Sequence, residues 1–266
     1  MLSLPFATTF ARMNLIITQI RVIVALVLRE TRMTFGSSHM GYLWAIIQPL
    51  VSISFMVFLF FIAGRQSPYG ASLALFFSTA ILTLELYNKT SVSLMRAFTS
   101  NKALLTYPMI KETDTLFARW VLIACTFVII NTIFYGGLIG LGLAQLPAHP
   151  DKLILAFLST CFLGFGIGTI NAIMYQRNQV WQHIEKILGR PLFFLSGVFY
   201  IPSNLPPQAI AVIKWNPILH LVEWTREGYY PNYESDVLNI GYPLSVATIA
   251  VLLGLFWERM TRKQRA

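Results

Sequence analysis

Long apolar runs alternate along this chain with short segments that carry most of its Lys and Arg residues. A helix needs about 20 predominantly apolar residues to cross about 30 Å of hydrocarbon. The pattern predicts an all-α membrane protein with about six transmembrane helices in a single domain, residues 1–266. The predicted spans are Tyr42–Gly64, Gln66–Ser93, Val121–Leu143, Leu153–Gln176, Pro191–Ile213 and Val237–Trp257.

The fifth run differs from the others because Gly197 and three prolines within residues 202–207 interrupt it. Proline removes a backbone donor and breaks a helix. We therefore expect a helix over about His183–Tyr200, followed by short re-entrant segments between the fifth and sixth spans. Non-helical backbone at membrane depth persists only inside protein or against a water-filled cavity. Residues 201–236 are therefore the predicted gate region of a pathway.

The segment before the first span, residues 10–33, carries four arginines among many Ile, Val and Leu residues. It is too charged to span a bilayer and too apolar to be fully solvated. An amphipathic helix lying in the membrane interface fits this pattern. A half-buried helix packed on the bundle is the alternative, and both interpretations place Arg29 and Arg32 near lipid headgroups.

The basic residues also predict the orientation of the spans. If the N-terminus is cytoplasmic, the inner segments hold sixteen Lys and Arg residues and the outer segments hold four. Cytoplasmic loops are enriched in Lys and Arg. Both termini are therefore expected in the cytoplasm.

Composition agrees with a membrane location, since 56% of the residues are hydrophobic and only 12% are charged. Soluble domains carry about 25% charged residues. The net charge of +9 does not indicate a nucleic-acid partner. A nucleic-acid surface needs a clustered basic patch, whereas these cations are distributed between apolar runs.

The chain has no Gly-Lys pair, so it lacks the loop that binds nucleotide phosphates in many ATPases. Any ATP and Mg²⁺ must then bind a partner subunit, and we expect no cofactor on this chain. The four histidines fall in separate segments and do not suggest a metal site. A membrane enzyme would need clustered catalytic groups; it remains an alternative together with a passive assembly anchor.

Glu85 is a carboxylate deep in the second predicted span, where such a group costs about 2.5–3.5 kcal/mol on insertion scales. Lys89 follows one helical turn later, in the favourable order for an ion pair. The two residues are interpreted either as a self-paired charge near the inner end of the helix or as a polar pair facing a pore.

The predicted cytoplasmic loop of residues 99–114 has an apolar centre between charged flanks. An exposed apolar cluster with a charged rim often marks a protein interface. The loop is either a short helix that docks on a cytoplasmic partner or a turn that packs on its own bundle.

Three blocks of residues resemble the permease subunits of ABC-2 type polysaccharide exporters, and together they cover nearly the whole chain. The first block is Arg29-Glu-Thr-Arg32, Phe35-Gly36, Gly41-Tyr-Leu-Trp44 and Pro49. The second, Asn101–Pro108, resembles the first cytoplasmic coupling loop of that family. The third resembles the capsular polysaccharide branch and comprises Ser196-Gly-Val-Phe-Tyr200, Leu205-Pro206, Asn216-Pro217, His220, Glu223 and Arg226-Glu-Gly-Tyr-Tyr230.

The resemblance implies a channel-forming permease in the bacterial inner membrane that exports lipid-linked capsular polysaccharide. It implies two copies of the chain bound to two ABC ATPase subunits, with ATP and Mg²⁺ on those subunits. A periplasmic polysaccharide copolymerase and an outer-membrane exporter would be further partners. The alternative cargo is O-antigen, teichoic acid or another amphipathic molecule.

The resemblance and the residue patterns together give four sets of candidate site residues. The expected entry site for a lipid headgroup or substrate is Arg29, Arg32, Tyr42 and Trp44. The intramembrane polar pair is Glu85 and Lys89. The expected ATPase-coupling residues are Lys102, Leu104, Leu105, Tyr107, Pro108, Met109 and Glu112. The expected periplasmic gate comprises Ser196, Gly197, Tyr200, Trp215, Asn216, His220, Glu223 and Arg226.

Overall fold

A computed structural model describes residues 21–34, 36, 39–106 and 110–263, and the described part is helical with no β-strand. The all-α prediction is therefore confirmed. Residues 21–34 form the first described helix. The elements that follow are α2 (His39–Ile62), α3 (Leu73–Met95), α4 (Ala97–Ser100), α5 (Glu112–Gly140), α6 (Pro150–Arg177), α7 (Trp181–Leu195), η1 (Pro202–Asn204), α8 (Pro207–Ile213), α9 (Pro217–Tyr229) and α10 (Gly241–Lys263).

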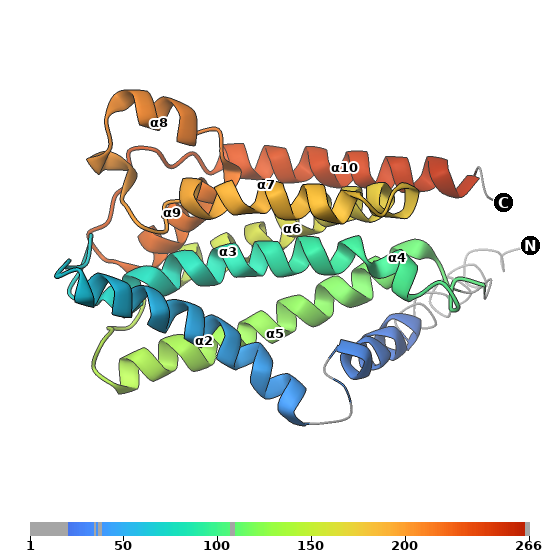
Figure 1. Ribbon diagram of the computed structural model, residues 1–266, viewed down its shortest axis with the longest axis horizontal. Coiled ribbons are helices and arrows are strands. Elements are labelled where there is room, and N and C mark those ends of the chain that lie inside the picture. The colour runs from blue at the N-terminus through green and yellow to red at the C-terminus, as the bar shows by residue number, and fades with distance from the viewer. Residues whose placement is uncertain (1–20, 35, 37–38, 107–109, 264–266) are drawn as a thin grey trace, which may run out of the picture.

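The long helices run lengthwise in one bundle (Figure 1). Helix α4 and the C-terminal end of α10 lie at one end of the bundle, which we call the α4 end, and α8 and α9 lie toward the opposite, α9 end. Among the described helices, four are long and apolar enough to cross a membrane: α2, α5, α6 and α10.

Helix α3 occupies most of the second predicted span, whereas α7 overlaps the fifth, Pro191–Ile213, only at residues 191–195, and the rest of that run includes η1 and α8. Neither α3 nor α7 meets that standard of length and composition. Helix α3 carries Glu85, Lys89 and many hydroxyl side chains, and 15 of its 23 residues are buried by other parts of the chain. Helix α7 has only 15 residues and none of them is buried. The two helices therefore have opposite environments, one in the core and one on the outside.

The core lies where α3 and α6 pack side by side, with α10 and α9 against α6 and with α5 and α2 against α3. Glycines on α6 permit this close packing. A Cβ at Gly166 would lie 2.8 Å from the backbone nitrogen of Val251 in α10, and one at Gly168 would lie 2.9 Å from Cβ of Leu94 in α3. Neither site has room for a larger side chain.

Two predicted boundaries are wrong because capping, not hydropathy, determines where these helices start. Helix α3 begins at Leu73 rather than at Gln66, and the Ser72 hydroxyl accepts a hydrogen bond from the Leu75 amide at 3.3 Å. Helix α5 begins at Glu112, well before the apolar run, and the Lys111 amide donates to Asp114 at 3.0 Å. Acidic side chains in the first turn also suit the positive end of the helix dipole.

Helix α7 ends at Leu195, earlier than the predicted Tyr200, because Gly197 takes a positive φ of 74° that continues no right-handed helix. The following short elements η1, α8 and α9 each have a proline at the first or second position, where the missing amide costs least. The predicted break is therefore confirmed.

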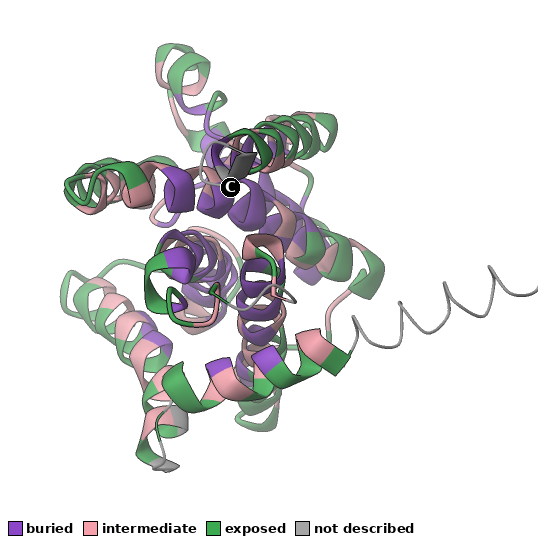
Figure 2. Ribbon diagram, turned by 90° about the vertical axis from the view of Figure 1, so that its right-hand side faces the viewer, coloured by how far each residue is buried: buried purple, intermediate pink, exposed green. Residues whose placement is uncertain are grey.

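Residues 21–34 form a helix that lies across the bundle, crosswise to the long helices seen end-on in Figure 2. Leu26 and Glu30, one turn apart, are buried, whereas Val24 and Leu28 are 51% and 63% exposed. Residues 21–34 therefore pack one face on the bundle, as the half-buried helix interpretation expects, and expose apolar side chains elsewhere. The remainder of predicted segment 10–33 lies outside the described residues.

Candidate functional site

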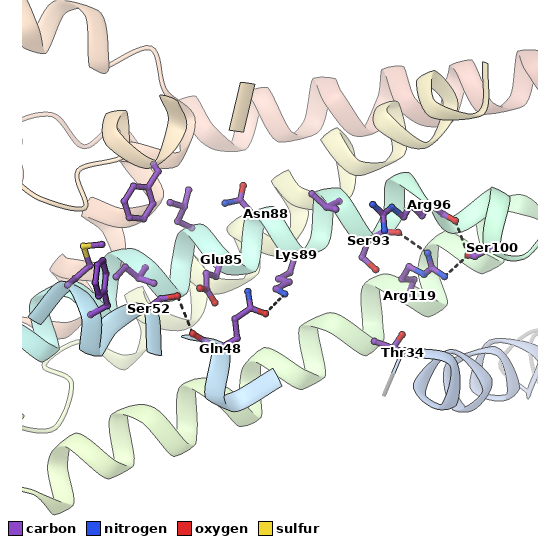
Figure 3. A pocket seen from close by; sticks show the side chains of 16 residues that line it. Thr34, Gln48, Ser52, Glu85, Asn88, Lys89, Ser93, Arg96, Ser100 and Arg119 are labelled. Atoms are coloured by element: carbon purple, nitrogen blue, oxygen red, sulfur yellow. Dashed lines mark hydrogen bonds between the residues drawn. The ribbon is translucent and has the colours of Figure 1, made fainter. Parts of the chain in front are cut away.

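A cavity of about 740 Å³ lies between α2 and α3 and extends toward the α4 end (Figure 3). Its polar residues come from α3 and from several other elements, and its apolar residues are contributed largely by α2 and α3. The residues that line it are Thr34, Gln48, Ser52, Phe55, Met56, Ile81, Leu84, Glu85, Asn88, Lys89, Val92, Ser93, Arg96, Ser100, Arg119 and Phe193.

The polar stripe consists of Glu85, Lys89 and Ser93 of α3 together with Arg96, the residue that follows α3, and all four line the cavity. Their spacing of three or four residues places them on one helical face. The stripe runs along the cavity from its middle to the α4 end (Figure 3). Helix α3 and the residue that follows it thus supply a carboxylate and two cations to the same space.

The predicted ion pair between Glu85 and Lys89 does not form. Lys89 instead donates from Nζ to Oε1 of Gln48 in α2 at 2.7 Å. The Glu85 Oε2 atom is buried and finds no hydrogen-bond partner in the described part of the chain. Gln48 therefore competes successfully for the ammonium group, and the interpretation of Glu85 and Lys89 as polar groups facing a cavity is the one that the geometry supports.

Positive charge predominates in the cavity wall. Its ionisable residues are three cations, Lys89, Arg96 and Arg119, and one carboxylate, Glu85. A cleft lined mainly by one sign of charge concentrates ligands of the opposite sign. The cavity is therefore suited to a molecule that carries phosphate or carboxylate groups.

Arg119 of α5 closes the α4 end of the cavity and contacts three other elements. Its guanidinium pairs with Glu30 of the helix at residues 21–34. It also donates to the Ser93 carbonyl oxygen in α3 at 2.8 Å and to Oγ of Ser100 in α4 at 2.7 Å (Figure 3). Next to this junction, Arg29 donates to the side-chain oxygen of Asn101. The junction therefore joins the crosswise helix to the start of the loop that follows α4.

The predicted entry residues are not gathered at this cavity. Arg29 is half-buried in its contact with Asn101, Arg32 is exposed, and Trp44 is 66% exposed on α2. None of these three belongs to the cavity lining, and the Tyr42 side chain lies outside the described part. Lys89, Arg96 and Arg119 supply the cations that line the cavity.

The predicted coupling loop is described only in part. Residues 101–106 form turns in which Lys102 is exposed and Leu104 and Leu105 are half-buried. Tyr107, Pro108 and Met109 lie outside the described residues, and Glu112 is the first residue of α5. The described part of the loop that follows α4 is therefore a series of turns rather than a continued helix.

At the α9 end, Glu223 and Arg226 of α9 form a fully buried ion pair with an N–O distance of 2.9 Å. The Arg226 guanidinium also donates to the carbonyl oxygens of Gly197 at 2.7 Å and of Tyr200 at 3.2 Å. It lies over the Phe76 ring, 4.1 Å from the ring centre. One arginine thereby fixes the chain that leaves α7 to both α9 and α3.

Residues of the loop that follows α9 complete this cluster. The hydroxyls of Tyr233 and Ser235 donate to Oε2 of Glu223 at 2.6 and 2.7 Å. Burial, together with the Glu223 carboxylate, raises the pKa of Tyr233. Tyr233 therefore keeps its proton and remains a donor at neutral pH.

The other predicted gate residues stabilise the same region. Asn216 caps α9 by accepting from the Ile218 amide at 3.0 Å, and its amide donates to Oγ of Ser196 at 3.0 Å. His220 contacts the Lys214 carbonyl oxygen and the Asn239 amide, not Glu223. Trp215 is 68% exposed and does not belong to the buried cluster.

Sequence reasoning missed the residues that hold these sites together. Glu30 and Arg119 were not among the predicted site residues, although a charge of each sign beside an apolar run is a signal that partners should be sought. Phe76, Tyr233 and Ser235 gave no signal, because their roles depend on contacts between distant segments.

These features define a helical membrane protein that encloses a cationic cavity. The chain belongs to the ABC-2 type transporter family, which matches residues 21–230. It is similar to the polysialic acid transport protein KpsM of Escherichia coli, with 28% identity over 241 residues that cover 90% of this chain and 93% of KpsM.

Two further relatives have comparable similarity. The capsule polysaccharide export inner-membrane protein BexB of Haemophilus influenzae is 28% identical over 233 residues, 88% of each chain. The protein of the same description named CtrC, from Neisseria meningitidis serogroup B, is 27% identical over 246 residues, 92% of this chain and 91% of CtrC.

Proposed function

We propose that this chain is the channel-forming permease subunit of an ATP-driven exporter that moves lipid-linked capsular polysaccharide across the bacterial inner membrane. Membership of the ABC-2 type transporter family supports a transport role, and relatives named for capsule or polysialic acid export support the cargo. The observation that carries the proposal is the cavity whose charged lining is three cations and one carboxylate.

The mechanism follows from the placement of charge. An anionic headgroup or acidic sugar enters at the α4 end, where Arg96 and Arg119 lie, and passes Lys89 further along the same helix face. Arginine suits phosphate and carboxylate because it donates two parallel hydrogen bonds to them. The buried Glu223–Arg226 cluster, at the opposite end, fixes the segments of the proposed gate.

The proposed topology has six spans, with α3 and α7 as the second and fifth, and re-entrant segments at α8 and α9. Both termini and the α4 end are cytoplasmic. Because charged side chains in α3 and α7 would be costly against lipid, these helices need protein or water beside them. Two copies of the chain that enclose the cationic cavities between them satisfy that requirement.

The proposed assembly also contains two ATPase subunits, which bind ATP and Mg²⁺ and contact the loop of residues 99–114. Their closure shifts the permease between two conformations, since a partner can move an equilibrium by binding one state more tightly. A periplasmic polysaccharide copolymerase and an outer-membrane exporter receive the chain beyond the inner membrane.

The proposal is tested by co-expressing the chain with an ABC ATPase from the same capsule gene cluster and purifying the pair in lipid nanodiscs. We expect a complex whose ATP hydrolysis depends on this chain, and loss of surface polysaccharide when the chain is deleted. Leu105→Asp should reduce co-purification, whereas Leu146→Asp, at a 77% exposed leucine in the loop between α5 and α6, should spare it. Retention of surface polysaccharide in the deletion strain would refute the export role.

A further inference from the structure

Arg119 belongs to two sites at once. It lines the cationic cavity, and it is also the residue to which Glu30 of the crosswise helix is ion-paired. The side chains of Arg119 and Glu30 are only 10% and 6% exposed. A group bound in the cavity and the helix outside it therefore contact the same guanidinium.

The hydrogen bonds of Arg119 allow a second anion to compete with Glu30 for its guanidinium group. Its terminal nitrogens contact Glu30, the Ser93 carbonyl oxygen and the Ser100 hydroxyl. Its Nε atom is buried and has no hydrogen-bond partner among the residues that the structure describes. A guanidinium binds a carboxylate or a phosphate best through two parallel hydrogen bonds. Because Nε is unused, Arg119 has a further donor for an anion in the cavity, beyond the terminal nitrogen that contacts Glu30.

If Arg119 released Glu30, the Glu30 carboxylate would not remain buried at its present position. A buried carboxylate that loses its partner is strongly unfavourable, so the helix at residues 21–34 would have to move until Glu30 meets water. Arg29, the adjacent residue, is bound to Asn101 at the start of the loop that follows α4. Movement of this helix would therefore act directly on that loop.

We infer that Arg119 makes the position of the crosswise helix depend on whether an anionic group occupies the cavity. A phosphate or a carboxylate that enters the cavity draws Arg119 from Glu30, and the freed helix shifts the loop through the Arg29–Asn101 contact. The inference rests on the proposed function, because it supplies the signal by which cargo would control a partner ATPase. Coupling of this kind is reciprocal: displacement of the helix must also change the affinity of the cavity for the anion.

The test measures backbone hydrogen exchange of residues 21–34 in the permease–ATPase complex in nanodiscs. One arm compares phosphatidylcholine discs with discs that also contain phosphatidylglycerol, which supplies an anionic lipid phosphate. The other arm adds a glucuronic acid tetrasaccharide or, for comparison, a neutral glucose tetrasaccharide to phosphatidylcholine discs. We expect at least one anionic probe, and not the neutral sugar, to accelerate exchange in the wild-type complex.

Glu30→Gln should show accelerated exchange without any probe and no further response to the anions. The matched control is Glu227→Gln, which removes a carboxylate from the Lys152–Glu227 pair far from the cavity and should respond like the wild type. If Glu30→Gln does not assemble, the double variant with Arg119→Gln leaves no unpaired buried charge and should likewise lack the response.

A wild-type complex that responds to neither anion, or a Glu30→Gln complex that still responds, would overturn the inference. The exchange measurement needs no ATP hydrolysis and no export. Failure of the proposed function, seen as absent permease-dependent hydrolysis, is therefore distinguishable from failure of the link through Arg119.

Discussion

At the scale of single residues, the stability of the α9 end depends on one charge that is completely removed from solvent. Arg226 has 0% exposure, and its environment compensates the charge through Glu223, two backbone carbonyl oxygens and the face of Phe76. An arginine over an aromatic ring gains further electrostatic attraction. The cluster is therefore stable as a set and vulnerable to the loss of any one member.

Arg226→Ala should lower the free energy of unfolding by about 3–5 kcal/mol, because it leaves Glu223 buried without its partner. Chemical unfolding in detergent micelles, followed by tryptophan fluorescence, measures the change. Lys152→Ala is the matched control, since its ion pair with Glu227 involves a lysine side chain that is 40% exposed. Exposed pairs contribute about 0–1 kcal/mol, so equal losses in the two variants would argue against the role of burial.

Only part of this residue-level picture could be predicted from the sequence. Glu223 and Arg226 are three residues apart on one helix, a spacing that places two side chains together. The contacts of Arg226 with Phe76 and of Glu223 with Tyr233 join residues that no local pattern connects. Lys89 shows the same limit, because a local partner was available at Glu85 but Gln48 of another helix binds it.

At the scale of helices, four of the predicted spans contain a helix long and apolar enough to cross a membrane, namely α2, α5, α6 and α10, but hydropathy did not determine the helix ends. Ser72 and Asp114 cap α3 and α5 at positions that hydropathy does not mark. The break after α7 was predictable because Gly197 and the prolines that follow it cannot continue a helix. Helix ends are thus predictable where backbone chemistry forbids continuation and are missed where a side chain merely favours a start.

Gly166→Ala should destabilise the protein, because the added methyl would lie 2.8 Å from the Val251 backbone and push α6 from α10. Gly136→Ala in α5 is the matched control, since nothing lies within 4 Å of the position that its added methyl would take. Alanine is favoured over glycine in helices by about 0.5–1 kcal/mol. We therefore expect opposite shifts in the thermal unfolding temperature of the two variants, and a decrease of the same size in both would contradict the packing argument.

At the scale of the whole molecule, α7 is poorly covered by the rest of the chain, because none of its 15 residues is buried. Lys186 and Arg190 of α7 are both exposed, next to apolar residues such as Leu188, which is 59% exposed. Charged residues at membrane depth face protein or water rather than lipid. In contrast, α10 exposes apolar side chains such as Leu252, at 64%, which suits contact with lipid.

Cysteine cross-linking in native membranes should therefore distinguish the surface that contacts a second copy of the chain from the surface that faces lipid. In a background without Cys125 and Cys161, the chain's free cysteines, Leu188→Cys should give a dimer on oxidation and Leu252→Cys should remain a monomer. Gel electrophoresis without reductant measures the products. Dimers from Leu252→Cys alone would assign the contact between copies to α10 and remove α7 from it.

The tight packing of α6 determines which helices could move to admit cargo molecules of different width. More than half of its apolar window, 56%, is buried, against 11% for α2, and glycine contacts bring its backbone close to both α3 and α10. Displacement of α6 would disrupt several close contacts together, whereas a tilt of α2 would break few buried contacts within the chain. Widening of the cavity should therefore come from movement of α2, while α6 stays in place.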